Sequence, residues 1–214
     1  MIEETISTQA AQKFYDTLGA GHDKAEIYEG KAKQRGLAVL NPQPGQKLLN
    51  VGVGTGKEHA QLQTALAPDG LAFGLDFSPV MLRLAHNRTG TPLCRADAAT
   101  LPYPTATFDC LFSSYLLDLL PTTLLPQLLD GFYRVLKPGG RLVLVSLTEG
   151  VDLPSRALVG LWKAAYAISP VACGGCRPLQ LTSMVEAAGF REVQREVVVQ
   201  LAFPSEVIFA DKPL

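Results

Sequence analysis

The chain has 214 residues, of which 47% are hydrophobic and 18% are charged, and its formal net charge is −1. This length suffices for one large domain with a substantial core, and so apolar a composition excludes intrinsic disorder. Lys and Arg are dispersed and form no basic stripe, so nucleic acid is not an expected partner.

Two further patterns concern targeting and membranes. Residues 1–5 are acidic and lack the basic-then-apolar order of a signal peptide. The least charged long run, residues 110–129, contains Asp118, Pro121 and Pro126, which disqualify it as a membrane span. We therefore expect a cytoplasmic protein with no membrane span.

Residues 1–44 have apolar positions at helical spacing, such as Phe14 and Leu18, with a break at residues 19–23. These helices precede the first core strand, so we expect them to form a lid across the mouth of a ligand site, where Tyr15 can cover the ligand. The alternative is an amphipathic helix docked on the sheet.

A glycine-rich turn follows the first strand pattern. Residues 48–51 are apolar apart from Asn50, and glycines follow at positions 52, 54 and 56, before a helical pattern that begins near residue 57. This order is typical of a buried strand that turns sharply into a helix beside a ligand. The spacing fits neither a phosphate-binding P-loop nor the dinucleotide pattern G-x-G-x-x-G, whose third glycine is replaced by Lys57.

The second strand is predicted at residues 71–76, and Ser78 and Pro79 begin a helix that runs to about Asn87. Asp76 lies 20 residues beyond Gly56 at the C-terminal end of that strand. A carboxylate at this place can accept two hydrogen bonds from ribose hydroxyls. Because nucleotide dehydrogenases and methyltransferases share this geometry, Asp76 indicates an adenosine-type ligand without choosing between them.

The rest of the chain continues the alternation of strands and helices. Short connections between such elements predict right-handed crossovers and a parallel sheet. The expected fold class is therefore α/β, a doubly wound, Rossmann-like, mostly parallel sheet of seven strands with helices on both faces. The remaining strand patterns are residues 93–97, 108–114, 141–146, 193–201 and 207–210, and a helix at 123–136 is expected to stop at Pro138 and the glycines after it.

Three stretches resemble those of a known family. The G-x-G-x-G turn at residues 52–56 resembles motif I of the class I S-adenosylmethionine-dependent methyltransferases. Residues 97–102, with Phe108 and Asp109 beyond them, look like the adenine-side segment and fourth strand of the group that includes ubiquinone and menaquinone biosynthesis enzymes. Residues 134–140 are similar to that group's motif before the fifth strand. Their order and spacing are more specific than any one motif.

The resemblance implies S-adenosylmethionine as the cofactor, bound by a core at residues 45–149. In such enzymes the residue that corresponds to Asp97 faces the adenine amino group. The residue that corresponds to Ala98 supplies a backbone N–H donor to the ring. Asn50 stands where the family usually has Asp or Glu near the methionine ammonium, and an uncharged amide is expected to hold it more weakly. The implied cofactor-binding residues are Asn50, Gly52, Val53, Gly54, Gly56, Asp76, Phe77, Asp97, Ala98 and Ser114.

By the same resemblance, residues 150–181 look like the variable cap of these enzymes, and residues 182–214 add a helix and an antiparallel hairpin to the core. The cap is rich in Leu, Val and Ala, which favours a small apolar or aromatic methyl acceptor, although burial on the sheet explains this composition equally well. The expected acceptor-side residues are Tyr15, Tyr115, Trp162 and Arg177, the last as a partner for an anionic acceptor.

Methyl transfer from a sulfonium mainly requires alignment, which can lower a barrier by about 7–11 kcal/mol. A base is needed only where the acceptor must lose a proton early. Asp118, just after the fourth strand, is the candidate, with His22 as the weaker one, although Asp118 can equally orient the loop that follows it. Cys173 and Cys176 form a lone C-x-x-C, which is expected to be a turn rather than a metal or redox site.

Three functions stay open on the sequence. The first is a small-molecule methyltransferase. The second is a nicotinamide-dependent oxidoreductase, which shares the glycine turn and Asp76 but not the later motifs. The third is a methyltransferase-like protein that binds the cofactor without catalysis, which Asn50 and the lack of a compelling base keep open. Neither the acceptor nor the oligomeric state follows from the sequence.

Overall fold

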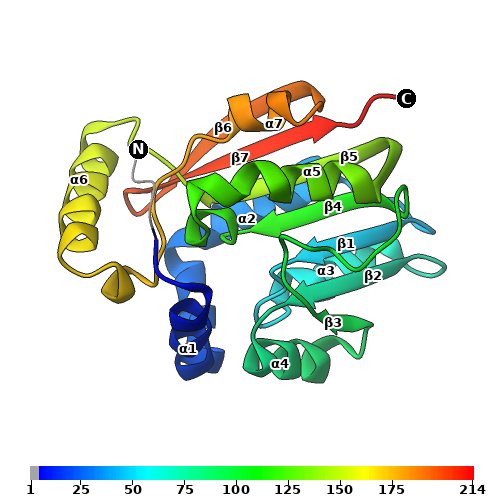
Figure 1. Cartoon of the computed structure of the whole chain (residues 1–214), viewed down its shortest axis with the longest axis horizontal. Coiled ribbons are helices and arrows are strands. Elements are labelled where there is room, and N and C mark those ends of the chain that lie inside the picture. Colours follow the sequence, from blue (N-terminus) through cyan, green and yellow to red (C-terminus); the bar gives the residue numbers. More distant parts are fainter. Residues whose placement is uncertain (1–4) are drawn as a thin grey trace.

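The computed structural model describes residues 5–214, which form one seven-stranded sheet with helices on both faces (Figure 1). Residues 1–4, on which part of the targeting prediction rests, lie outside the described residues. The strands are β1 (Lys47–Val51), β2 (Leu71–Asp76), β3 (Leu93–Arg95), β4 (Phe108–Ser114), β5 (Leu136–Leu147), β6 (Arg191–Gln200) and β7 (Phe203–Asp211). The helices are α1 (Thr8–Leu18), α2 (Glu26–Leu40), α3 (Lys57–Leu66), α4 (Pro79–Thr89), α5 (Leu125–Val135), α6 (Leu153–Ile168) and α7 (Thr182–Ala187). Short 3₁₀ segments are η1 (Gly19–Ala25), η2 (Leu117–Leu119), η3 (Thr122–Leu124) and η4 (Pro170–Cys173).

The strand order is β3-β2-β1-β4-β5-β7-β6. The first five strands along the chain pair in parallel, whereas β7 is antiparallel to both β5 and β6. The predicted fold class is therefore confirmed, including the final hairpin. Because the order reverses between β1 and β4, a crevice is expected beyond the carboxyl ends of these two strands.

Two predicted strands begin well before the expected residue: β7 begins at Phe203 instead of residue 207, and β5 shows the larger difference. The helix expected to continue to residue 136 ends at Val135, and β5 begins at Leu136 instead of residue 141. Pro138 disfavours helical backbone at the residue before it, so the chain becomes extended ahead of the proline. The two glycines then lie within an irregular part of the β4–β5 pairing, between Phe108 and Cys110 on the partner strand, and do not end the helix.

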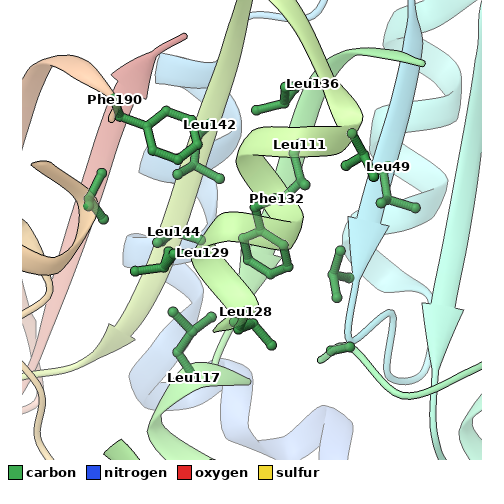
Figure 2. Close-up of a cluster of buried hydrophobic side chains, with 14 of the residues drawn as sticks. Leu49, Leu111, Leu117, Leu128, Leu129, Phe132, Leu136, Leu142, Leu144 and Phe190 are labelled. Carbon is green, nitrogen blue, oxygen red and sulfur yellow. The ribbon is translucent and has the colours of Figure 1, made fainter. Parts of the chain in front are cut away.

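Apolar side chains bury both faces of the sheet. Under α5, the buried side chains of Leu128, Leu129 and Phe132 pack on Leu111 and Leu142 of the central strands (Figure 2). On the other face, α2 and α3 cover a second buried cluster. Burial at roughly 25 cal/mol per Å² of apolar surface makes these two layers the main stabilising contribution to the fold.

The segment expected as a cap contains α6 and η4. Figure 1 shows α6 standing at one end of the sheet, and its buried residues include Val159 and Tyr166. Its first turn is fixed by a capping box between Asp152 and Ser155. Among the helices of residues 5–214, none combines the length and the apolar character that crossing a bilayer requires.

His59 of α3 is fully buried, and its Nε2 lies 2.8 Å from the hydroxyl of Thr91. Within residues 5–214 its Nδ1 has no hydrogen-bond partner. Burial lowers the pKa of His59 to about 4, because a charged imidazolium would lose its hydration there. His59 therefore packs in the core, and its ring is neutral at pH 7.

This burial predicts a pH-dependent stability. Below about pH 6.5 the unfolded chain takes up a proton on His59, whereas the folded protein does so only near pH 4. The unfolded state then binds more protons, so the free energy of unfolding falls as the pH is lowered through this window, by up to about 3 kcal/mol for this group. We expect His59→Gln to flatten that fall in urea titrations followed by circular dichroism, while His86→Gln, on an exposed part of α4, leaves it unchanged. An equally steep fall in the His59 variant would contradict this account.

Candidate functional site

A cavity lies beyond the carboxyl ends of the central strands, where the strand order reverses. Its walls come from the turn after β1, the ends of β2 and β4, the segment after β3, and α1 with η1 on the opposite side. Predicted cofactor residues that line this cavity are Gly52, Gly54, Asp76, Phe77, Asp97, Ala98 and Ser114.

The glycine turn has two separate physical roles. Gly54 has φ +55° and lines the cavity, so its backbone can approach a ligand without a side chain between them. Gly56 has φ +83° and begins α3, and a Cβ built on it would lie 2.8 Å from Cα of Ala85 in α4. Gly56 is therefore required for close packing of the turn on α4, whereas Gly54 shapes the cavity.

Asp76 connects this turn to the next one. Its Oδ2 accepts a hydrogen bond of 2.9 Å from the Gly54 N–H, and its Oδ1 accepts one of 2.9 Å from the Ser78 N–H. Burial raises the pKa of Asp76, although these hydrogen bonds favour the carboxylate. A carboxylate offers about four lone-pair sites, so two remain for hydroxyl groups in the cavity that Asp76 lines.

The next wall is apolar, with a carboxylate at its edge. Leu75, Met81 and Ala96 line the cavity beside Asp97, whose Oδ1 accepts a hydrogen bond of 2.9 Å from the Ala99 N–H. This arrangement can receive a flat aromatic base against apolar surface while a polar edge group faces Asp97. It agrees with the predicted adenine side of the site.

α1 and η1 cover the opposite side of the cavity through residues that include Ala11, Tyr15 and His22. Asp16 of α1 accepts a hydrogen bond from the Ser78 hydroxyl, and Asp23 of η1 accepts one of 2.5 Å from the Thr55 hydroxyl. Both contacts join this segment to the turns that carry the predicted cofactor residues. The segment thus has the position of a lid, which we retain as a proposal for α1 and η1, whereas α2 packs on the sheet.

Two predicted acceptor-side residues do line the cavity. The ring of Tyr15 meets that of His22 edge to face, with centroids 5.6 Å apart. Burial lowers the pKa of His22 to about 4, so its imidazole is neutral. Tyr115 adopts φ +50°, uncommon for a bulky residue, and its hydroxyl lies 2.6 Å from Ser205 Oγ.

Trp162 and Arg177 are not among the residues that line the cavity. The Trp162 Nε1–H donates a hydrogen bond of 2.8 Å to the carbonyl of Cys176. Arg177 is fully buried, and its guanidinium donates 3.0 Å to the carbonyl of Asp118 and 2.9 Å to the hydroxyl of Thr122. Both side chains hold the segment around Cys176 against the core, and an anion-binding role for Arg177 has no support from this geometry.

Asp118 is also fully buried and does not line the cavity. Its Oδ2 accepts hydrogen bonds of 3.2 Å from the Leu147 N–H and 2.9 Å from the thiol of Cys176. Burial raises the pKa of Asp118 to about 6. These contacts fit the alternative stated for Asp118, that it orients a loop, and we do not propose it as a base.

Besides Gly56, two predicted cofactor residues do not line the cavity, Asn50 and Val53. Asn50 is 2% exposed in the middle of β1 and does not line the cavity. Val53 lines a small neighbouring pocket, which shares Gly52, Gly54, Ser114, Tyr115 and His22 with the cavity.

Sequence reasoning missed the charged residues of that second pocket. They are Asp23 of η1, Glu26 and Lys33 of α2, and Lys57 and Glu58 of α3. The only available signal is the placement of Lys57 and Glu58 directly after the glycine turn, together with acids and a lysine at helical spacing in residues 26–33. Helical charges at such spacing ordinarily indicate a solvated face.

Comparisons with known proteins identify the family and the cofactor. A family model described as "Methyltransferase domain" matches residues 49–144. The malonyl-[acyl-carrier protein] O-methyltransferase of Herminiimonas arsenicoxydans is 33% identical over 181 residues, which are 84% of this chain and 66% of that protein. The demethylmenaquinone methyltransferase of Geobacillus sp. (strain WCH70) is 32% identical over 134 residues, 60% of this chain and 56% of that protein. The chain thus spans between about half and two thirds of the length of these curated relatives.

A solved N-methyltransferase of Haemonchus contortus, in complex with S-adenosylhomocysteine, has the same fold, with a TM-score of 0.70, 17% identity, and coverage of 98% of this chain and 61% of that chain. The chain belongs to the class I S-adenosylmethionine-dependent methyltransferases. The predicted family and the predicted cofactor, S-adenosylmethionine, are confirmed.

The contacts of Asp76 predict a large effect on cofactor binding. Replacement Asp76→Ala removes the acceptor for two backbone N–H groups and for cofactor hydroxyls, so we expect S-adenosylmethionine to bind at least about tenfold more weakly in isothermal titration calorimetry. Asp76→Asn keeps one acceptor oxygen and should be intermediate. Asp69→Ala, at an exposed position before β2, serves as the control. Unchanged affinity in Asp76→Ala would remove this residue from the site.

Proposed function

We propose that the protein transfers the methyl group of S-adenosylmethionine to a small apolar or aromatic acceptor. The observation that carries the proposal is the charge of the cavity lining. Among the described residues that line the cavity, none is Lys or Arg, and the acids are Asp76 and Asp97. Such a lining favours a neutral adenosine with a positive sulfonium and disfavours the pyrophosphate of a nicotinamide dinucleotide.

The cofactor, when bound, supplies an activated methyl group, and the chain's residues position the reactants. In this proposal Asp76 accepts hydrogen bonds from the ribose, Asp97 accepts one from the adenine amino group, and the Ala98 N–H donates one to the ring. Tyr15 and His22 line the opposite wall, with their rings in edge-to-face contact. Alignment of this kind is the main requirement of a direct displacement.

The acceptor is expected on the apolar side of the cavity. Leu116, Leu119, Leu120 and Pro121 line it after β4, and Ile6 and Ala11 face it from the N-terminal segment. The two relatives are named for acceptors of different chemistry, a demethylmenaquinone and a malonyl-acyl carrier protein. The buried position of Arg177 and the lack of a lining cation favour an aromatic acceptor of the quinone type over a carboxylate.

Two measurements test this proposal. Calorimetry should show saturable binding of S-adenosylmethionine and S-adenosylhomocysteine and none of NADH. With methyl-labelled cofactor, label should move to a short-chain naphthoquinol and not to a malonyl thioester. Transfer only to the malonyl thioester would contradict the acceptor class, and binding of NADH alone would contradict the whole proposal. Cofactor binding without transfer to any apolar acceptor would favour the non-catalytic alternative.

A further inference from the structure

A largely buried group of titratable side chains lies between α2 and α3, next to the glycine turn. Lys33 Nζ is 2.8 Å from Glu26 Oε1, 3.0 Å from Glu29 Oε2 and 3.5 Å from Glu58 Oε1. The side chains of Lys33, Glu29 and Glu58 are 7%, 9% and 11% exposed. We name these four residues the ion cluster.

Carboxylates outnumber cations in the ion cluster by three to one. Burial, only partly offset by Lys33, raises the pKa of Glu29 to about 7, and burial also raises the pKa of Glu58. In residues 5–214, Oε2 of Glu29 has no hydrogen-bond partner other than the Lys33 ammonium at 3.0 Å. A positive charge in addition to Lys33 and the nearby Lys57 would therefore relieve both the repulsion between the acids and their unfavourable burial.

The ion cluster also faces a pocket. Glu26, Lys33 and Glu58 line the small pocket that shares Gly52 and Gly54 with the cofactor cavity. The main cavity is mostly apolar, so it suits the adenosine part of the cofactor but not an ammonium and a carboxylate. The small pocket is the adjoining place where Glu58 can meet an ammonium while Lys33 or Lys57 meets a carboxylate.

Glu58 is the best placed member of the cluster for this contact. It lies in the first turn of α3, directly after Gly56 and Lys57, and its distance to Lys33 is the longest of the three. Its carboxylate is thus the one farthest from the Lys33 ammonium. Asn50 of the neighbouring strand β1 carries no charge and does not line either pocket.

We propose that the ion cluster, through Glu58, binds the ammonium group at the amino-acid end of S-adenosylmethionine. This inference rests on the proposed function only in taking S-adenosylmethionine as the cofactor. It assigns the charged end of the ligand to α2 and α3, in addition to the strand ends that hold the adenosine.

Three ligands separate this role from a structural one. S-adenosylmethionine and S-adenosylhomocysteine both carry the amino-acid end, whereas 5′-methylthioadenosine lacks it. Replacement Glu58→Gln keeps the size of the side chain and removes its charge. By calorimetry we expect about tenfold weaker binding of the first two ligands, the loss of a charge-assisted hydrogen bond, and less than about twofold change for 5′-methylthioadenosine.

A matched control removes a carboxylate from another ion pair of α2. Glu196 pairs with Arg35 at 2.7 Å on the surface, and Glu196→Gln should leave all three affinities unchanged. Equal weakening of all three ligands in Glu58→Gln would show that Glu58 acts through the shape of the glycine turn and would overturn the proposal. Unchanged binding of S-adenosylmethionine would also overturn it. Failure of the wild-type protein to bind S-adenosylmethionine would instead contradict the proposed function itself.

Discussion

The pair of backbone hydrogen bonds accepted by Asp76 is the constraint on which the site depends. One comes from the turn between β1 and α3 and the other from the turn between β2 and α4, so a single carboxylate sets the distance between two neighbouring strand ends. Those turns form the floor of the cavity, and the lid segment binds to the same two turns through Asp16 and Asp23. The charge of Asp76 is tolerated in a buried place because backbone donors surround it, and this arrangement leaves lone pairs directed to a ligand.

The fold and the adenosine side of the site are predictable because they depend on local rules. Short apolar strands separated by turn residues, with right-handed crossovers, determine most of the sheet order. The positions of the glycine turn and of Asp76 beside the cavity are predictable because both directly follow, or end, a strand that the sequence pattern identifies. The boundary near Pro138 is the exception, and there the restriction that proline places on the preceding residue outweighs the expected glycine stop.

The acceptor side is much less predictable, because a polar residue near a site can point into the cavity or into the core. Arg177 and Asp118 are 59 residues apart along the chain, yet the guanidinium of one donates to the carbonyl of the other. That contact holds the Arg177 guanidinium in the core, while the Leu147 N–H and the Cys176 thiol hold the Asp118 carboxylate there. No local pattern reveals these long-range contacts. Lys33 and Glu58 show the converse, since charges expected on a solvated helix face are buried beside the glycine turn.

The hydroxyl of Ser78 has a consequence for how ligands gain access. It accepts the N-cap hydrogen bond of α4 from the Met81 N–H, at 3.0 Å, and it donates to Asp16 of α1. A hydroxyl can do both, because its single hydrogen and its lone pairs serve different partners. Release of α1 therefore breaks only the donated bond, while α4 keeps its cap. In the lid motion proposed for α1, the mouth of the cavity opens over a floor that stays folded.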